Sequence, residues 1–285
     1  MKLSVVIAAH NEETLLPAQL AALQAQTHDG DWDVIVADNR STDATARIVT
    51  DLAAEWPRLR LVAAMERAER SYAWNTALAA SDADAFVFTD ADDIVAPGWV
   101  AAAAAGLSDA SMITGPLDLD TLNPPELAAS RGLSMRKPVG HFEGLFPVVY
   151  GNNFGMTREA LDQVGPFTEG AFPVDDMEVS LRAHRAGIAI VGCPDLVVQY
   201  RYRSDLGSLW RQGFGYGRGR CRLARSLIDA GEPRPPRVAG WKSWLRLVAA
   251  TPSVVTAGGR ARWVWILANR LGQVRGSFEN RLLYV

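Results

Sequence analysis

The stretch FVFTDADDIVAPGW, residues 86–99, places three carboxylates directly after an apolar run. Asp90, Asp92 and Asp93 follow a segment whose continuous hydrophobicity is typical of a strand buried on both faces. Burial and mutual repulsion both disfavour charged carboxylates in such a place. A hard divalent cation such as Mg²⁺ or Mn²⁺ would offset their charge, because it takes oxygen ligands and completes its shell with substrate phosphates. The cluster therefore predicts a metal site that binds a nucleotide diphosphate, and a turn formed by Asp side chains is the alternative.

A second group of carboxylates lies in PVDDMEVSLRAHRAG, residues 173–187. The apolar spacing predicts a helix that begins near Asp175, so that Asp175 and Asp176 fall in its first turn. Carboxylates there are favoured by the helix dipole without any catalytic role. The same groups are also suited to act as a general base. The residues alone leave both interpretations open.

The segments that must position these residues alternate between strands and helices. Apolar runs of strand length are followed by stretches with helical spacing of apolar residues. The predicted strands cover 3–10, 32–39, 59–64 and 84–90, and the predicted helices cover 14–26, 41–54 and 72–81. Such alternation predicts an α/β fold with a Rossmann-like, mostly parallel central sheet flanked by helices.

Polar residues gather where three of the predicted strands end. His10 ends the first strand and Glu12 follows it, Asp38 lies at the end of the second, and the acidic cluster begins at Asp90, the last residue of the fourth. Ligands of parallel α/β sheets bind at the carboxyl ends of the strands, near the point where strand order reverses. We therefore expect these residues to share one edge of the sheet. For Asp38 alone, a role in a turn fits equally well.

Composition excludes several classes of protein. The 285 residues suffice for one large or two small domains with a core, and 48% hydrophobic residues exclude a disordered chain and a membrane bundle. A net charge of −3 gives no reason to expect nucleic acid as a partner. Two cysteines, Cys193 and Cys221, are too few for a disulfide scaffold or a structural zinc site. They favour a reducing, cytoplasmic location.

Four motifs taken together resemble the inverting family 2 glycosyltransferases of GT-A fold. They are SVVIAAHNEE, VIVADNRSTDAT, FTDADD and PVDDMEVSLRAHRAG, and the resemblance covers about residues 1–225. It implies that Asp90 and Asp92 occupy the outer positions of a DxD motif. Asp92 is then the direct metal ligand, and Asp90 lies nearer the ribose or a metal-bound water. The donor-binding residues implied for a nucleotide sugar are Ala8, His10, Glu12, Asp38, Arg70, Asn75, Asp90 and Ala91. For Arg70 and Asn75, a solvated helix start is the alternative.

The resemblance also assigns roles on the acceptor side. Displacing a nucleoside diphosphate with inversion at the anomeric carbon requires a base that removes the proton of the acceptor hydroxyl. The family's Glu–Asp pair aligns with Asp175–Asp176, which implies Asp176 as the catalytic base and Asp175 as its acceptor-side neighbour. Glu178 remains the rival base. Asn152 and Asn153 either hydrogen-bond acceptor sugar hydroxyls or form a turn.

The sequence departs from the family pattern at two places. Some relatives supply a His to the metal from a strand after the catalytic helix, but here that strand reads DLVVQYRYR, and Gln199 or water is expected instead. Polymerising members carry Gln-x-x-Arg-Trp, which WRQGFGYGRGR fails to match at both later positions. We therefore expect transfer of one sugar. The glycines of this stretch predict a flexible loop over the donor, in which Arg211 and Arg218 either clamp the diphosphate or are solvated.

Residues 231–285 are predicted to form a helical extension of a catalytic domain at 1–230. Within that domain, residues 1–115 would bind the donor and residues 116–230 the acceptor. Neither apolar stretch of the extension reaches the roughly 20 residues of a spanning helix. Its tryptophan, lysine and arginine residues fit a helix lying on an anionic membrane surface. A helical pair packed on the catalytic domain, or on a second subunit of a homodimer, fits as well.

The sequence thus predicts a metal-dependent, inverting glycosyltransferase of the hexosyltransferase type, with Mg²⁺ or Mn²⁺ as cofactor. The donor is a nucleotide sugar, with UDP-sugars favoured, and the acceptor is a sugar, a lipid-linked molecule or a small molecule. Such an enzyme would serve polysaccharide, glycolipid or natural-product glycoside synthesis in the cytoplasm or at the inner face of the membrane. A nucleotide-sugar-binding scaffold without catalysis is one alternative. A nucleotidyltransferase is another, although it would ordinarily show a basic, Gly-rich loop where this chain reads HNEETLLP.

Overall fold

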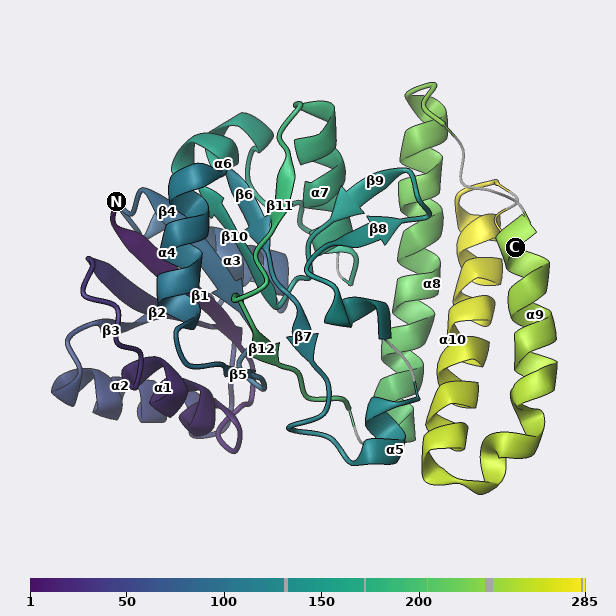
Figure 1. Ribbon diagram of the computed structural model, residues 1–285, viewed down its shortest axis with the longest axis horizontal. Coiled ribbons are helices and arrows are strands. Elements are labelled where there is room, and N and C mark those ends of the chain that lie inside the picture. The colour runs from purple at the N-terminus through teal and green to yellow at the C-terminus, as the bar shows by residue number, and fades with distance from the viewer. Residues whose placement is uncertain (131–132, 172, 204, 234–237, 283, 285) are drawn as a thin grey trace.

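A computed structural model describes residues 1–130, 133–171, 173–203, 205–233, 238–282 and 284, with the backbone alone described for 238–243. Its centre is a sheet in the strand order β11-β6-β10-β4-β1-β2-β3 (Figure 1). Strand β1 pairs in parallel with β2 and β4, β2 with β3, and β6 with β11, whereas β10 runs antiparallel to β4 and β6. The strands are β1 (Leu3–Ala9), β2 (Trp32–Asp38), β3 (Leu59–Ala63), β4 (Ala85–Thr89), β6 (Met112–Thr114), β10 (Asn153–Thr157) and β11 (Ile190–Gly192). The predicted α/β architecture with a mostly parallel sheet is confirmed.

Helices cover both faces of this sheet, because successive side chains of each strand point to opposite sides. Val5 and Ile7 of β1 pack in one buried cluster, whereas Val6 packs in another. The first cluster includes side chains of α1 (Leu16–Gln24), α2 (Thr45–Glu55) and α4 (Trp99–Asp109). The second includes side chains of α3 (Arg70–Ala79), α6 (Arg158–Val164) and α7 (Asp175–Arg185). The two layers hold the strands rigidly, so that the strand ends form a fixed edge.

Two small sheets lie beside this core. Strands β5 (Ile94–Val95), β12 (Val198–Gln199) and β7 (Leu117–Asp118) form one sheet, in which β12 is central. Strands β8 (Gly140–Phe142) and β9 (Phe146–Val148) form a hairpin whose buried residues pack against α7 and α8 (Leu206–Asp229). Short helices α5 (Pro125–Ala128) and η1 (Leu133–Arg136) connect the two sheets. This region supplies the second wall of the site described below.

The C-terminal part of the chain is helical and packs against α8. Helix α10 (Ala257–Glu279) packs along α8, and α9 (Val238–Ala250) lies outside α10, joined to it by η2 (Thr251–Val255) (Figure 1). A Cβ added to Gly217 of α8 would lie 2.1 Å from the backbone oxygen of Asn269. A Cβ added to Gly272 of α10 would lie 2.1 Å from that of Phe214. Glycine is therefore required where the two helix backbones meet.

The flexible loop predicted around residues 210–220 is wrong, because this stretch lies within the 24-residue helix α8. Glycines lower intrinsic helix propensity, but packing against α10 outweighs that preference here. The alternative in which the C-terminal helices pack on the rest of the chain agrees with the contact between α10 and α8.

Candidate functional site

The carboxyl ends of β1, β2 and β4 lie side by side, because these strands are parallel neighbours. Ala8 is half-buried near the end of β1, and the next residue of that strand pairs with Asp38 of β2. Asp38 is buried, and its Oδ1 accepts the Ser41 backbone N–H at 3.3 Å. His10 Nδ1 donates to the Asn39 carbonyl oxygen at 2.7 Å. The strand ends thus bring the predicted donor-side residues to the edge where the acidic cluster also lies.

The acidic cluster, Asp90, Asp92 and Asp93, follows β4. One carboxylate oxygen from each residue lies within 4.8 Å of the others. Asp93 is fully buried, its Oδ1 accepts the Arg201 backbone N–H at 2.7 Å, and its Oδ2 accepts the Asn152 side-chain N–H at 2.6 Å. Both oxygens of Asp93 are therefore engaged within the fold. Asp90 and Asp92 are the members of the cluster available to a cation.

Burial dominates the electrostatics at this edge. It raises the pKa of Asp90 to about 6, an effect that Arg70 opposes and Asp92 reinforces. Burial also raises the pKa of Asp92, with Arg203 opposing. The pKa of Glu12 rises to about 7 through burial and then through the charge of Asp92. Carboxylates that repel one another in a buried place are the oxygen ligands that a hard cation takes, so the residues present fit Mg²⁺ or Mn²⁺.

Arg70, the first residue of α3, connects the acidic cluster to the carboxylates of α7. Its Nε and Nη2 donate to the two oxygens of Asp175 at 3.0 and 2.5 Å. Its Nη1 lies 3.5 Å from Asp90 Oδ1, and its guanidinium lies 4.6 Å from the ring centroid of Trp74. The Asp175 side chain is fully buried, and that of Arg70 is 18% exposed. A bidentate pair in this setting fixes the orientation of the guanidinium.

Asp176 lies next to Asp175 in the first turn of α7 and lines the pocket described below. Its Oδ1 accepts the Met177 backbone N–H at 2.7 Å, and its Oδ2 accepts the Gly151 backbone N–H at 3.3 Å. Burial raises the pKa of Asp176 to about 7, the charge of Asp175 adds to the rise, and Arg70 opposes it. A carboxyl group with a pKa near neutrality is suited to accept a proton at physiological pH.

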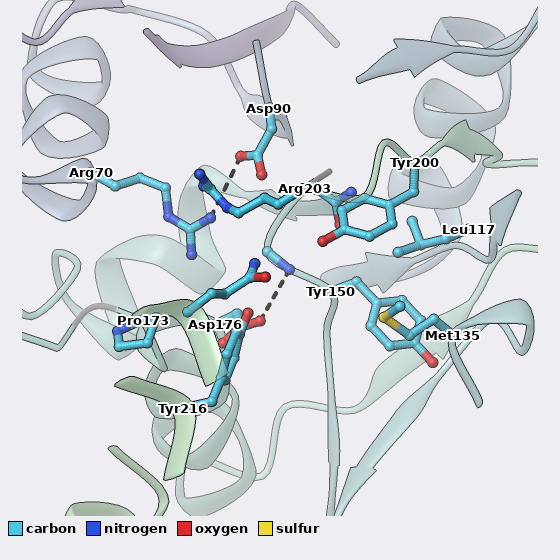
Figure 2. A pocket seen from close by; sticks show the side chains of 13 residues that line it. Arg70, Asp90, Leu117, Met135, Tyr150, Pro173, Asp176, Tyr200, Arg203 and Tyr216 are labelled. Atoms are coloured by element: carbon cyan, nitrogen blue, oxygen red, sulfur yellow. Dashed lines mark hydrogen bonds and ion pairs between the residues drawn. The ribbon is translucent and has the colours of Figure 1, made fainter. Parts of the chain in front are cut away.

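A pocket opens between the two groups of carboxylates (Figure 2). Charged side chains line one part of it, and tyrosine and apolar side chains line the other. The charged residues are Arg70, Asp90, Asp176 and Arg203, and the others include Leu117, Met135, Tyr150, Tyr200 and Tyr216. Asp176, the predicted base, and Asp90 of the predicted DxD motif therefore line one cavity, although they lie far apart in the sequence. Asp92 is not among the lining residues, and one of its carboxylate oxygens lies within 4.8 Å of one of Asp90.

Arg203 and the three tyrosines were not expected from the sequence. Figure 2 shows the Arg203 side chain extended into the pocket below Asp90. Its charge opposes the rise in the pKa of Asp92 and of Glu12. The signal for Arg203 is the run YRYR directly after a strand, at the same edge as the acidic cluster. Gln199, expected in place of a third metal ligand, lies in β12 and is not among the lining residues.

Several predicted site residues make their contacts inside the fold. Asn75 exchanges two hydrogen bonds, each 2.9 Å long, with the backbone of Phe167. Asn153 is fully buried, its Oδ1 accepts the Trp99 indole N–H, and its Nδ2 donates to two backbone carbonyls. Ala91 is buried in the hydrophobic core. Asn75, Asn153 and Ala91 are not among the residues that line the pocket.

The predicted arginines and the rival base also lie away from the lining residues. Arg211 and Arg218 are exposed on α8, and Arg218 pairs with Glu279 of α10 at 2.5 Å. Glu178 pairs with Arg182 one helical turn later at 2.9 Å. Arg203 lines the pocket, whereas Arg211 and Arg218, the two arginines predicted from the sequence, do not.

Comparison with known sequences identifies similar proteins. The family model described as glycosyl transferase family 2 matches residues 4–165. The chain is 36% identical to the uncharacterized glycosyltransferase YfnE of Bacillus subtilis (strain 168), over 35% of this chain and 26% of that one. It is 28% identical to the succinoglycan biosynthesis protein ExoA of Rhizobium meliloti (strain 1021), over 76% of this chain and 68% of ExoA. The match with YfnE spans about a quarter of that relative's length.

Solved structures share the fold at low sequence identity. The mannosyltransferase PcManGT from Pyrobaculum calidifontis, in complex with GDP-Man and Mn²⁺, aligns with a TM-score of 0.67 and 19% identity over 98% of this chain and 87% of that one. TarS 1–349 of S. aureus, in complex with UDP-GlcNAc, aligns with a TM-score of 0.55 and 15% identity over 100% and 93% of the two chains. Similarity at this level concerns the fold alone.

Proposed function

The chain belongs to glycosyl transferase family 2, and from that premise we propose that it is a metal-dependent, inverting glycosyltransferase that moves one sugar from a nucleotide diphosphate to an acceptor hydroxyl. Its fold is the GT-A fold, as predicted. The observation that carries the proposal is the single pocket lined by Asp90 and by Asp176, whose pKa is about 7. Arg70 and Arg203 line the same pocket and offer the positive charge that a diphosphate requires.

On the donor side, Asp92 and Asp90 would hold Mg²⁺ or Mn²⁺. When bound, the metal neutralises the diphosphate and so stabilises it as a leaving group. The guanidinium of Arg203 binds phosphate oxygens, and Arg70, anchored by Asp175, orients the Asp90 carboxylate. The ends of β1 and β2 are proposed to bind the base and ribose through His10, Glu12 and Asp38. The Mn²⁺ in the PcManGT complex supports a divalent metal without deciding between the two ions.

On the acceptor side, Asp176 is the proposed general base. It takes the proton of the acceptor hydroxyl while the hydroxyl oxygen attacks the anomeric carbon opposite the leaving diphosphate, so the anomeric configuration inverts. The hydrogen bond from the Gly151 N–H orients the carboxylate. Tyr150 and Tyr200 offer ring faces on which the apolar face of a sugar can pack.

The classes of donor and acceptor are proposed from one sequence motif and from the names of similar proteins. Transfer of one sugar is favoured because the chain lacks the Arg and Trp that follow Gln in the polymerising members. UDP-sugars are the favoured donors, and a GDP-sugar is the main alternative, since TarS and PcManGT were solved with UDP-GlcNAc and GDP-Man respectively. The name of ExoA supports an acceptor in polysaccharide assembly.

The donor site is tested by calorimetric titration with UDP-, GDP- and dTDP-sugars, in Mn²⁺ and in chelator. We expect one nucleotide to bind in a metal-dependent way, and Asp92→Ala to abolish that binding. Asp51→Ala is the matched control, because Asp51 is an exposed carboxylate on α2. Failure of all three nucleotides to bind the wild type would contradict the proposal.

The catalytic role is tested separately. Asp176→Asn should retain donor binding and lose turnover, measured as release of nucleoside diphosphate with a panel of acceptors. Asp162→Asn, an exposed site on α6, should leave both unchanged. Donor binding by the wild type without turnover on any acceptor would favour the scaffold alternative over the enzyme.

A further inference from the structure

Helix α9 and the turn η2 present an apolar surface to solvent. Leu245 and Val248 of α9 are 55% and 71% exposed, and Val255 of η2 is 80% exposed. The side chain of Leu247, between them on the same helix, is buried. Helix α9 contacts the rest of the chain through α10 and η2, and it forms the outer edge of the molecule (Figure 1). Its outward side is therefore an apolar helix face without a partner in the described part of the chain.

Hydrogen bonds of Arg260 and Thr256 hold the turn that carries Val255. Arg260 Nη1 donates to the backbone oxygens of Val254 and Val255 at 3.3 and 3.2 Å. Thr256 caps α10, since its Oγ1 accepts the Gly259 N–H at 3.0 Å. The exposure of Val255 is thus imposed by the fold, and the guanidinium of Arg260 is held next to it.

The charge of this segment is of one sign. Residues 233–278 contain no Asp or Glu, although the whole chain carries a net charge of −3. Arg246 of α9 and Arg260 of α10 are both exposed, and Arg260 is the one that donates to the backbone of Val255. Among the described residues, no helix has the length and apolarity needed to span a bilayer. An amphipathic helix of this kind instead lies in the interface of an anionic membrane.

We propose that the α9–η2 face, formed by Leu245, Arg246, Val248, Val255 and Arg260, docks on an anionic lipid bilayer. The apolar side chains enter the boundary between headgroups and acyl chains, and the arginines contact lipid phosphates. A second copy of the chain fits less well, because a symmetric contact would gather the arginines of both copies in one interface, and residues 233–278 supply no carboxylate to pair with them. A nucleic acid would leave the three aliphatic side chains in water. The inference is independent of the catalytic assignment.

The test is flotation of the full-length chain with lipid vesicles. Vesicles of phosphatidylcholine alone are compared with a two-to-one mixture of phosphatidylcholine and phosphatidylglycerol. We expect binding to the mixture, weakened by salt, and little binding to phosphatidylcholine, because each basic residue near an anionic surface strengthens binding about fivefold. Equal binding to both vesicles, or none to either, would overturn the proposal.

Variants locate the surface. Val248→Glu with Val255→Glu should lower the partition coefficient roughly tenfold or more, and Arg246→Glu should lower it on anionic vesicles. Val191→Glu is the matched control, because Val191 is a 42% exposed valine on β11, far from α9. A double Glu variant that stays folded by circular dichroism and binds like the wild type would overturn the proposal. So would light scattering that shows a dimer which the double variant dissociates, since that result would assign the face to a second copy.

Discussion

Replacing Arg70 by Met tests whether one buried ion pair organises the site. Arg70 donates to both oxygens of Asp175, whose side chain is fully buried, and it also contacts Asp90. Removing one partner of a buried pair leaves an uncompensated charge and destabilises the fold by about 3–5 kcal/mol. Met keeps an apolar contact with Trp74, so the loss is mainly electrostatic.

The expected shift in melting temperature follows from the size of the chain. At about 2.1 cal/mol/K per residue, the unfolding entropy of 285 residues is about 0.6 kcal/mol/K. Arg70→Met should therefore lower Tm by about 5–8 °C in scanning calorimetry. The double variant Arg70→Met, Asp175→Leu removes both charges and should recover most of that loss. Arg47→Met, which breaks an exposed pair with Asp51, is the control and should leave Tm nearly unchanged.

Activity separates the two roles of the pair. Both Arg70 variants remove the contact between Arg70 and Asp90, so we expect kcat/KM to fall in both, although only the single variant is strongly destabilised. A Tm of Arg70→Met within about 2 °C of the wild type would refute the reasoning, since breaking a buried ion pair should lower Tm by about 5–8 °C. A double variant as unstable as the single one would refute it as well.

Three further outcomes are expected. At saturating Mn²⁺, kcat/KM should fall with decreasing pH through an apparent pKa near 7, because Asp176 must be deprotonated to act as a base and burial raises its pKa to about 7. A fall in kcat/KM centred near pH 4 would contradict the raised pKa. Asp176→Asn should lower kcat roughly 10²–10⁴-fold. Mn²⁺ at about 100 times its Kd should raise Tm by about 4–5 °C at pH 8. The shift should shrink at pH 5, where the acidic cluster binds protons, and an unchanged shift in Asp92→Ala would contradict the metal site. Asn152→Ala removes a donor from the buried carboxylate of Asp93 and should lower Tm by about 2–5 °C and weaken Mn²⁺ binding. Asn75→Ala breaks two hydrogen bonds outside the pocket and should lower Tm without changing the affinity for Mn²⁺. Equal Mn²⁺ affinities in Asn152→Ala and Asn75→Ala would contradict a role of the Asn152–Asp93 hydrogen bond in metal binding.

Periodicity was sufficient to predict the first half of the fold. The runs at 3–10, 32–39 and 84–90 correspond to β1, β2 and β4, because continuous apolar runs suit strands buried on both faces. The stretch from Trp210 to Arg220 was misread, because local glycine content favours a loop whereas the preference for helix here comes from α10, about 50 residues later. Tertiary contacts of this kind leave no local signal in the sequence.

For the site, sequence reasoning found the carboxylates and misjudged several neutral residues. Asp90, Asp92 and Asp176 carry charge, and charge after a strand or in a helix start is visible locally. The amides of Asn75 and Asn153 have the right type for a ligand, but their partners are backbone groups that only the folded chain brings near. Arg203 enters the pocket through the path of the chain after β12, which the spacing of residues does not specify.

The close approach of α8 and α10 has a mechanical consequence. At Gly217 and Gly272 the backbones of the two helices meet directly, so no side chain of these two residues separates the helices there. Densely packed interiors have low compressibility and transmit strain. A displacement of α10 is therefore expected to move α8, and with it Gln212 and Tyr216, which line the pocket. The Tyr216 ring also contacts Trp265 of α10, with 5.9 Å between the ring centroids. A partner that binds the outer helices is therefore expected to shift one wall of the cavity.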